Sequence, residues 1–365
     1  MSFVFATSKV GSKHVEASSF SAKKVVTSKV VCDKVNINSL NFNDSNGLAL
    51  GTSSYPSSAD SSSVAIGAGS NSNGPSGIAI GRLSNTGSGQ NCISLGFGAG
   101  GTNSTGDSNI VIGPYCVANI SGDGNIVQGV LSGVALTSGD HNLIVGYNTA
   151  TTLTIGSENV VQGFQSNIVE LGYTYNAVAI GSRSKVASGG VALGSRAEAT
   201  HRCTIAIGGG IDMAYTGAKA SANGAIAIGA GSSEYNYGAR AGGIGSIAIG
   251  SCDASPDGDY GATSSGTCSI AIGSSYYGDA AASATGDFAI AIGPVSEAPY
   301  DNSIALGRYA QASTTNQLNI NVSGTATPSL RTEFTLDGGT GAHNTDSDRL
   351  KVTIGGTDYY IRLYQ

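Results

Sequence analysis

One four-residue pattern constrains this chain more than any other feature: a large apolar residue, a small residue, a second large apolar residue and a glycine. Sixteen copies occur, from LALG at 48–51 to IALG at 304–307, most of them with Ala or Ser at the small position, and successive pattern glycines lie 13 to 23 residues apart. Repetition at such short intervals is typical of a solenoid, in which each repeat forms one coil that stacks on the next. Each copy therefore predicts a short β-strand followed by a turn.

The two faces of these strands differ in side-chain size. Alternate residues of a strand point to opposite faces, so Val64 and Ile66 share one face while Ala65 lies on the other. We expect the large face to fill the interior of the coil, because burying one Ile or Val contributes about 1.5–3 kcal/mol. The small, uncharged face favours close approach by another backbone, most simply from several copies of the chain packed around a common axis. A monomeric solenoid with a smooth face is the alternative.

The glycine after each strand is predicted to form a sharp turn. A narrow coil must reverse direction within a few residues, and glycine adopts positive φ without steric cost. Ser, Asn, Asp and Gly, which favour turns, fill the intervals between the copies. The predicted structural turn glycines are Gly67, Gly81, Gly181, Gly194, Gly208, Gly229, Gly250, Gly273, Gly293 and Gly307.

Composition narrows the possible partners of the chain. Only 12% of the residues are charged, 40% are hydrophobic and the formal net charge is −6, which indicates an ordered protein and predicts no nucleic-acid partner. No apolar run reaches 18 residues, so we expect no membrane insertion, and the first residues lack the pattern of a signal peptide. Six cysteines are scattered singly, and Cys203 and Cys268 are interpreted as small, half-buried fillers.

Residues 1–46 have a different period. An apolar residue recurs every five positions from Phe5 to Leu40, a spacing that suits neither a flat strand nor a helix. We interpret this segment as a thin β-stem and an attachment region. A pentapeptide-type solenoid, or a segment ordered only when it docks on a partner, remains open.

Residues 308–365 are predicted to cap the solenoid. Apolar residues alternate in 350–354 and again in 359–363, and the turn sequence Gly-Gly-Thr-Asp lies between them. This pattern predicts a β-hairpin over 349–364. Terminal repeats of a solenoid need such a cover for their open end.

Long loops between 208 and 293 are the candidate recognition surface within the repeat region, 47–307. There the intervals lengthen to 20–23 residues, and insertions at one point of each turn are expected to stack on one flank. Tyrosine combined with Ser, Gly and Asn forms adaptable binding surfaces, and sugars suit them. Packing of these rings on neighbouring turns is the alternative. The candidate receptor-binding residues are Tyr215, Tyr235, Tyr237, Tyr260, Tyr276 and Tyr277.

The sequence offers no catalytic constellation. The four histidines lie far apart, and none stands in a metal-binding or triad-like motif. Three carboxylates, Asp253, Asp257 and Asp259, form a weak calcium candidate, although their Asp-Gly context is also ordinary turn chemistry. We therefore expect no enzyme activity, no catalytic residues, no resident metal and no cofactor.

The runs SVAIGAGS (63–70), GIAIGR (77–82) and SIAIGS (246–251 and 269–274) resemble the head repeats of trimeric autotransporter adhesins. The resemblance covers residues 47–307. It implies an all-β fold, a left-handed parallel β-roll of about 16 turns, with three copies of the chain packed as a homotrimer.

The ending VTIGGTDYYIRLY (352–364) resembles the closing hairpin of fibre proteins of phages and large DNA viruses. Together the two resemblances suggest a trimeric fibre or spike on a virion surface, joined to other virion proteins through residues 1–46 and binding a host surface glycan or protein. The alternatives are a bacterial trimeric adhesin head, a polysaccharide-degrading tailspike and a purely structural virion fibre.

Overall fold

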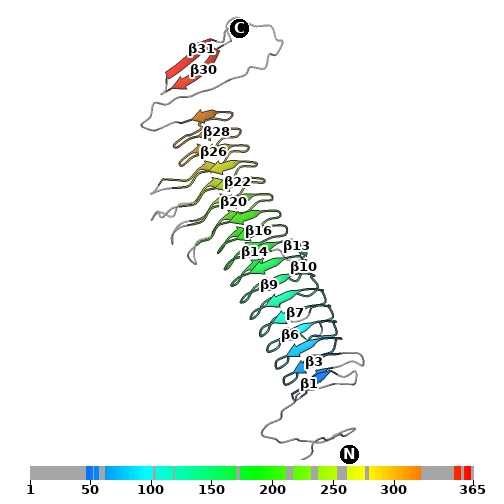
Figure 1. Ribbon diagram of the computed structural model, residues 1–365. Helices are drawn as coiled ribbons and strands as arrows, with labels where there is room; N and C mark the ends of the chain where they lie inside the picture. Colours follow the sequence, from blue (N-terminus) through cyan, green and yellow to red (C-terminus); the bar gives the residue numbers. More distant parts are fainter. Residues whose placement is uncertain are drawn as a thin grey trace, which may run out of the picture. The chain divides into compact units, whose positions relative to one another are not determined.

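The computed structural model describes twelve ranges, which are 47–51, 53–56, 62–101, 104–117, 120–169, 173–210, 217–231, 237–252, 261–275, 279–321, 349–354 and 357–362. All regular elements among these residues are β-strands, and the solenoid strands run parallel. The prediction of an all-β parallel solenoid is therefore confirmed (Figure 1). The predicted stem, 1–46, lies outside the described residues, and a threefold assembly remains a prediction.

The chain divides into two compact units, Met1–Gln165 with Leu171–Tyr175, and Ser166–Glu170 with Asn176–Gln365. In the first unit, consecutive copies of the repeat pair in register, so that Ala65 lies beside Ala79. The strands of this ladder are β1 (Leu48–Leu50), β3 (Val64–Ile66), β5 (Ile78–Ile80), β6 (Ile93–Leu95), β7 (Ile110–Ile112), β8 (Ile126–Gln128), β9 (Leu143–Val145) and β11 (Val160–Gln162). Short pairs join β2 (Tyr55–Pro56) to β4 (Asn71–Ser72) and β10 (Ile155–Ser157) to β13 (Tyr173–Tyr175).

The second unit contains two parallel ladders. The first ladder continues the repeat through β14 (Val178–Ile180), β16 (Val191–Leu193), β18 (Ile205–Ile207), β20 (Ile226–Ile228), β22 (Ile247–Ile249), β24 (Ile270–Ile272), β26 (Ile290–Ile292), β28 (Ile304–Leu306) and β29 (Leu318–Ile320). The second ladder consists of two-residue strands, β12 (Asn167–Ile168), β15 (Lys185–Val186), β17 (Glu198–Ala199), β19 (Lys219–Ala220), β21 (Arg240–Ala241), β23 (Thr263–Ser264), β25 (Ser283–Ala284) and β27 (Glu297–Ala298).

All sixteen copies of the repeat form strands, and β29 adds a strand that the pattern did not mark, because its sequence, Leu-Asn-Ile, has a polar central residue. Near the C-terminus, β30 (Arg349–Ile354) and β31 (Thr357–Arg362) pair antiparallel, with Ile354 opposite Thr357. They lie within the predicted hairpin. Its role as a cap remains a prediction.

The expected orientation of the repeat strands is wrong. In the three-residue strands of the first ladder from β3 to β28, the central residue is buried. The two residues that flank it are half-buried or exposed. In β18, for example, Ala206 is fully buried while Ile207 is exposed. The central side chains therefore line the interior of the coil, and the two flanking side chains, mostly Ile, Val or Leu, face outward.

The width of the coil explains this inversion. In the second unit, alanines of the first ladder share the interior with small inward residues of the second ladder, such as Ala199, Ala220 and Ala241. Because side chains of both ladders share one narrow interior, two large side chains do not fit there in every turn. In the first unit many of the inward residues are larger: Val111, Val117, Ile120, Val127, Leu136, Ile144, Leu153 and Val161.

Each turn glycine is required by its backbone and by its neighbour. The ten predicted turn glycines have φ between 106° and 157°, a region that L side chains rarely adopt. They also stack along the coil, so a Cβ built on Gly208 would lie 2.5 Å from the carbonyl oxygen of Gly229 in the next turn. A side chain at these positions would force successive turns apart.

Residues in the left-handed backbone conformation lie before and after most strands of the first ladder. Many turns have a residue with positive φ two positions before the strand and another two positions after the turn glycine, as at Asn176 and Arg183 around β14. Cys203 and Cys268 occupy the first of these positions, with φ of 55° and 52°, and both are exposed. The interpretation of these two cysteines as half-buried fillers is therefore wrong.

Candidate functional surfaces

The most extensive candidate surface is the outward apolar face of the first ladder. Strand after strand presents two large apolar side chains, and those nearest the turn remain well exposed, as for Ile80 (39%), Ile180 (39%) and Ile292 (40%). Because the strands pair in register, these side chains form continuous columns within each unit. Contiguous exposed apolar surface of this kind marks an interaction site.

A column of aromatic turn residues lies beside this face in the first unit. The ring of Phe97 meets that of Tyr115 edge-on, with centroids 4.9 Å apart, and the guanidinium of Arg82 lies 5.4 Å from the Phe97 centroid. Tyr147 and Phe164 stack at 5.5 Å. Sequence analysis did not mark these rings, because they follow the turn glycines at ordinary interval length. They show that two tyrosines of this solenoid pack on a phenylalanine of a neighbouring turn, the kind of packing that the alternative hypothesis supposed for the loop tyrosines.

A column of charged residues lies on the outer face of the second ladder in the second unit. Lys185, Glu198, Lys219 and Arg240 occupy successive strands in direct register. The Lys185 Nζ lies 2.8 Å from Oε1 of Glu198, and the Lys219 Nζ lies 3.1 Å from Oε2. Burial raises the pKa of the Glu198 carboxyl, but the two lysines outweigh it and hold that pKa below its ordinary value.

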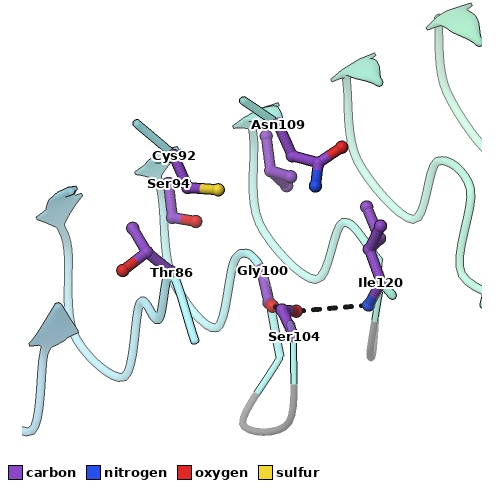
Figure 2. A pocket seen from close by; sticks show the side chains of 8 residues that line it. Thr86, Cys92, Ser94, Gly100, Ser104, Asn109 and Ile120 are labelled. Carbon is purple, nitrogen blue, oxygen red and sulfur yellow. Dashed lines mark hydrogen bonds between the residues drawn. The ribbon is translucent and has the colours of Figure 1, made fainter. Parts of the chain in front are cut away.

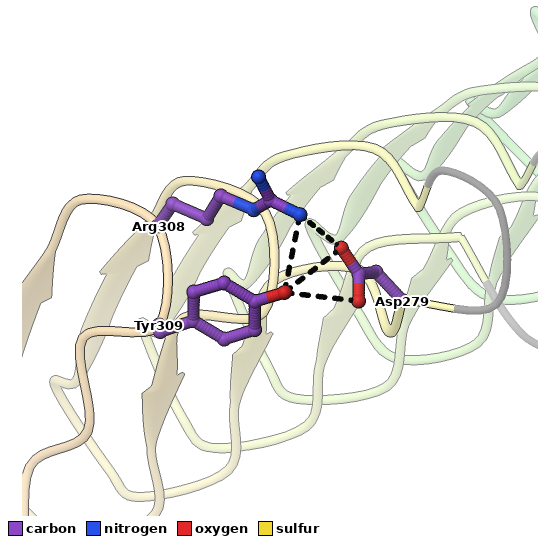
Figure 3. Close-up of polar contacts among 3 residues, drawn as sticks. All are labelled: Asp279, Arg308 and Tyr309. Carbon is purple, nitrogen blue, oxygen red and sulfur yellow. Dashed lines mark hydrogen bonds and ion pairs between the residues drawn. The ribbon is translucent and has the colours of Figure 1, made fainter. Parts of the chain in front are cut away.

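A further ion pair connects the last turns of the second unit. The Arg308 guanidinium donates to Oδ2 of Asp279 at 2.5 Å, and the Tyr309 hydroxyl donates to Oδ1 of the same carboxylate at 3.1 Å (Figure 3). The Arg308 guanidinium also lies 4.8 Å from the centroid of the Tyr309 ring. The bond from Arg308 holds the pKa of Asp279 below its ordinary range. These contacts fasten residues near 279 to a turn that follows about thirty residues later in the chain.

Buried asparagines stabilise the first unit from within. Asn125, Asn142 and Asn159 each donate from Nδ2 to the side-chain oxygen of the asparagine one turn earlier, at 2.9–3.0 Å, the first of them to Asn109. Each also donates to a backbone carbonyl, as Asn142 does to Gly156. Every polar group of the ladder therefore has a partner, which makes it a structural device and no open site.

Aspartates join the turns on the outside. Asp107, Asp123 and Asp140 each accept a hydrogen bond from the backbone N–H of a residue one turn earlier, at 2.7–2.8 Å. Asp287 and Asp301 do the same in the second unit, at 2.7 and 2.9 Å. These carboxylates therefore bridge successive turns at the surface of the coil.

One small void lies inside the first unit, where the inward residues change from alanine to valine (Figure 2). It has room for about one water molecule. Hydroxyls at its wall are already bonded, since Ser94 donates to the Asn85 carbonyl and Ser104 accepts from the N–H of Ile120. Burial raises the pKa of the neighbouring Cys92 thiol, which disfavours a reactive thiolate. The lining residues are Thr86, Cys92, Ser94, Gly100, Ser104, Asn109, Val111 and Ile120.

Most of the predicted binding residues lie outside the described residues. This applies to five of the six candidate tyrosines, Tyr215, Tyr235, Tyr260, Tyr276 and Tyr277, and to the calcium candidates Asp253, Asp257 and Asp259. The sixth, Tyr237, lies next to the charged column, with the Arg240 guanidinium 5.3 Å from its ring centroid.

Among the described residues, no group of three or more His, Cys, Asp or Glu side chains could hold a metal ion. That part of the chain also contains no helix long and apolar enough to cross a membrane.

Comparison with known proteins agrees with this geometry. The family described as "YadA head domain repeat (2 copies)" matches residues 61–84, 216–232, 280–296 and 301–316, about a fifth of the chain. No curated protein matches the chain. The matched segments contain strands of the first ladder in both units, among them β3, β5, β20, β26 and β28. Segments of this solenoid are therefore similar to the YadA head repeat, and the parallel β-solenoid fold fits that likeness.

Proposed function

We propose that this chain is the head of a trimeric surface adhesin, a bacterial one as the family comparison favours, which associates through its apolar face and attaches to a surface without catalysis. The observation that carries the proposal is the outward column of Ile and Val side chains in a solenoid built from YadA head repeats. An isolated chain would leave these columns in water, which is unfavourable by about 25 cal/mol per Å² of apolar surface.

Copies of the same chain are the partner that best fits this face. The columns repeat with the register of the ladder, so a second copy in parallel orientation would meet the same spacing at every turn. The number three comes from the resemblance to trimeric adhesin heads. The sequence-based expectation of self-association is thus retained, but the face proposed for it is the opposite one.

Attachment is proposed to use the surfaces that self-association leaves free. In the second unit these include the outer face of the second ladder. The candidate tyrosines of the long insertions are proposed to contribute to the contact. The hypothesis of a virion fibre or spike, on a virion surface and joined through residues 1–46, remains a prediction. It depends on the C-terminal hairpin sequence, and the family comparison supports the adhesin alternative instead.

The experiment measures attachment of beads coated with the full chain to panels of cells and immobilised matrix components. Coated beads are expected to attach above an albumin-coated control. A variant with serine at all six candidate tyrosines is expected to lose most of that attachment. The matched control carries serine at Tyr115, Tyr147, Tyr175 and Tyr300, four exposed tyrosines that are not candidates, and should keep it.

Two outcomes would count against the proposal. Beads that attach to nothing above the albumin control would reject the adhesive function. Equal losses in the two tyrosine variants would reject the insertions as the contact while leaving adhesion itself in place.

A further inference from the structure

Charge is distributed unevenly along the solenoid. Residues 173–252 contain six Lys and Arg against three Asp and Glu, although the whole chain has a net charge of −6. On either side in the sequence, residues 47–172 contain one basic and six acidic residues, and residues 253–321 contain one basic and seven acidic residues. One segment of an acidic solenoid is therefore basic.

The charged column described above concentrates this positive charge on one face. It runs along β15, β17, β19 and β21, and the register places Lys219 directly between Glu198 and Arg240. The next strand, β23, presents Thr263 at the same position. We name these four residues, Lys185, Glu198, Lys219 and Arg240, the basic band.

The Glu198 carboxylate within the basic band already binds two cations. Glu198 is buried, and its two oxygens accept from two different lysines. The lysine side chains are 49% and 30% exposed, so each ammonium, with three N–H donors, still faces solvent. Glu198 thus holds the side chains of Lys185 and Lys219 on either side of one carboxylate.

Two cationic residues of the band are direct neighbours, since Lys219 pairs in register with Arg240. Uncharged Thr263 and Ser283 occupy the same position in the next two strands. The band therefore ends at β21 on this side.

We propose that the basic band binds an anionic glycan, a polysaccharide bearing sulfate or carboxylate groups. This inference rests on the proposed adhesive function and names its ligand class. Lys185, Lys219 and Arg240 supply the cations, and Tyr237, beside Arg240, offers a ring on which a sugar can stack. The band lies on the second ladder and not on the apolar first ladder, so self-association leaves it accessible.

The extent of the band favours a glycan over a nucleic acid. Four strands span about 14 Å, the length of a few sugar units, and acidic segments follow on both sides in the sequence. Within the second ladder, a long polyanion that continued past the band would reach the exposed carboxylate of Glu297 in β27 and be repelled.

The test measures binding of heparan sulfate fragments to the full chain, with neutral dextran and single-stranded DNA as comparison ligands. Binding is expected at about 0.15 M NaCl and should weaken strongly at about 0.5 M, since salt screens exposed charges. Arg240→Gln, which leaves the Glu198 ion pairs intact, should weaken binding severalfold, and Lys219→Gln with Arg240→Gln by about tenfold or more. The control, Arg82→Gln with Arg308→Gln, removes the same net charge elsewhere and should change binding less than about twofold.

Several results would overturn the inference. These are absence of heparan sulfate binding, equal losses in the two double variants, and equal or tighter binding of DNA or dextran. Circular dichroism of each variant excludes unfolding as the cause of a loss, and Arg240→Gln provides the test if the double variant misfolds.

Bead attachment separates this inference from the proposed function. If coated beads attach to cells and soluble heparan sulfate does not compete, the glycan inference fails and the adhesive function stands. If the chain binds the glycan through the band but beads attach to nothing, the adhesive function fails and the binding site stands.

Discussion

At the scale of single residues, stacking of identical positions decides which side chains are allowed. Two adjacent glycines show the contrast. Gly208 has φ of 140° and faces the backbone of Gly229, whereas a Cβ on Gly209 would find its nearest atom at an ordinary 3.4 Å. Because the strands pair in register, the same backbone strain and the same close neighbour occur at this position in the next turn. This is why the turn glycine recurs along the solenoid.

This contrast gives a paired prediction. Gly208→Ala should lower the free energy of unfolding by about 3 kcal/mol, because it combines backbone strain with a clash against a neighbouring turn. Gly209→Ala should change it by less than about 1 kcal/mol. Chemical unfolding followed by circular dichroism measures both, and similar losses in the two variants would show that the glycine column does not stack as described.

The asparagine ladder gives a second residue-scale prediction. Asn142→Ala leaves the Gly156 carbonyl and the N–H donors of Asn159 without their buried partner, so a loss of about 2–3 kcal/mol is expected. Ser303 occupies the same position before its strand, but its hydroxyl bonds only locally, to the Tyr300 carbonyl. Ser303→Ala should therefore cost less than about 1 kcal/mol. If the serine variant loses as much as the asparagine variant, the ladder has no special role.

Single residues also show where sequence analysis succeeded and where it failed. The alternation of large and small residues located all sixteen strands, because period two and the following glycine are local signals. It did not reveal which face points inward, since that depends on the distance between the two legs of the coil. The column of Asn109, Asn125, Asn142 and Asn159 was visible as an Asn before four consecutive copies, and its spacing was the signal that could have revealed it.

At the scale of elements, the second ladder combines small buried residues with a charged outer column. Its two-residue strands offer few backbone bonds, so the ion pairs of Glu198 with Lys185 and Lys219 contribute to holding β15, β17 and β19 in register. Sequence analysis did not mark this charged column, because two-residue strands have no recognisable period.

Stability of this element should depend on pH. The folded-state pKa of Glu198 lies below its unfolded value, so its stabilisation is fully present above the unfolded pKa of about 4.3 and is lost as pH falls through the folded pKa. Unfolding midpoints of the full chain should therefore decrease below about pH 4.3, and Glu198→Gln should remove part of that decrease.

Glu297→Gln is the matched control for the pH series. Glu297 occupies the equivalent position in β27 and is exposed. Its variant should follow the acid profile of the unmodified chain. An identical profile for Glu198→Gln would mean that the buried carboxylate contributes nothing to acid stability.

At the scale of the whole molecule, the inversion of the strands changes what an isolated chain exposes. Alanines inside the coil need no partner, whereas the outward Ile and Val columns do. Substitutions on the two faces should therefore act differently. Ala248→Leu should destabilise the coil itself by overpacking, and outward changes at Ile228 and Ile249 should weaken association while the coil stays folded.

The most direct test asks whether the outward apolar face joins copies of the chain. It measures the mass of the purified full chain in dilute solution by mass photometry, beside the Ile228→Lys and Ile249→Lys double variant. The account predicts particles of three chains for the unmodified protein and folded single chains, with unchanged β-sheet circular dichroism, for the variant. Stable, folded single chains of the unmodified protein at micromolar concentration would contradict it.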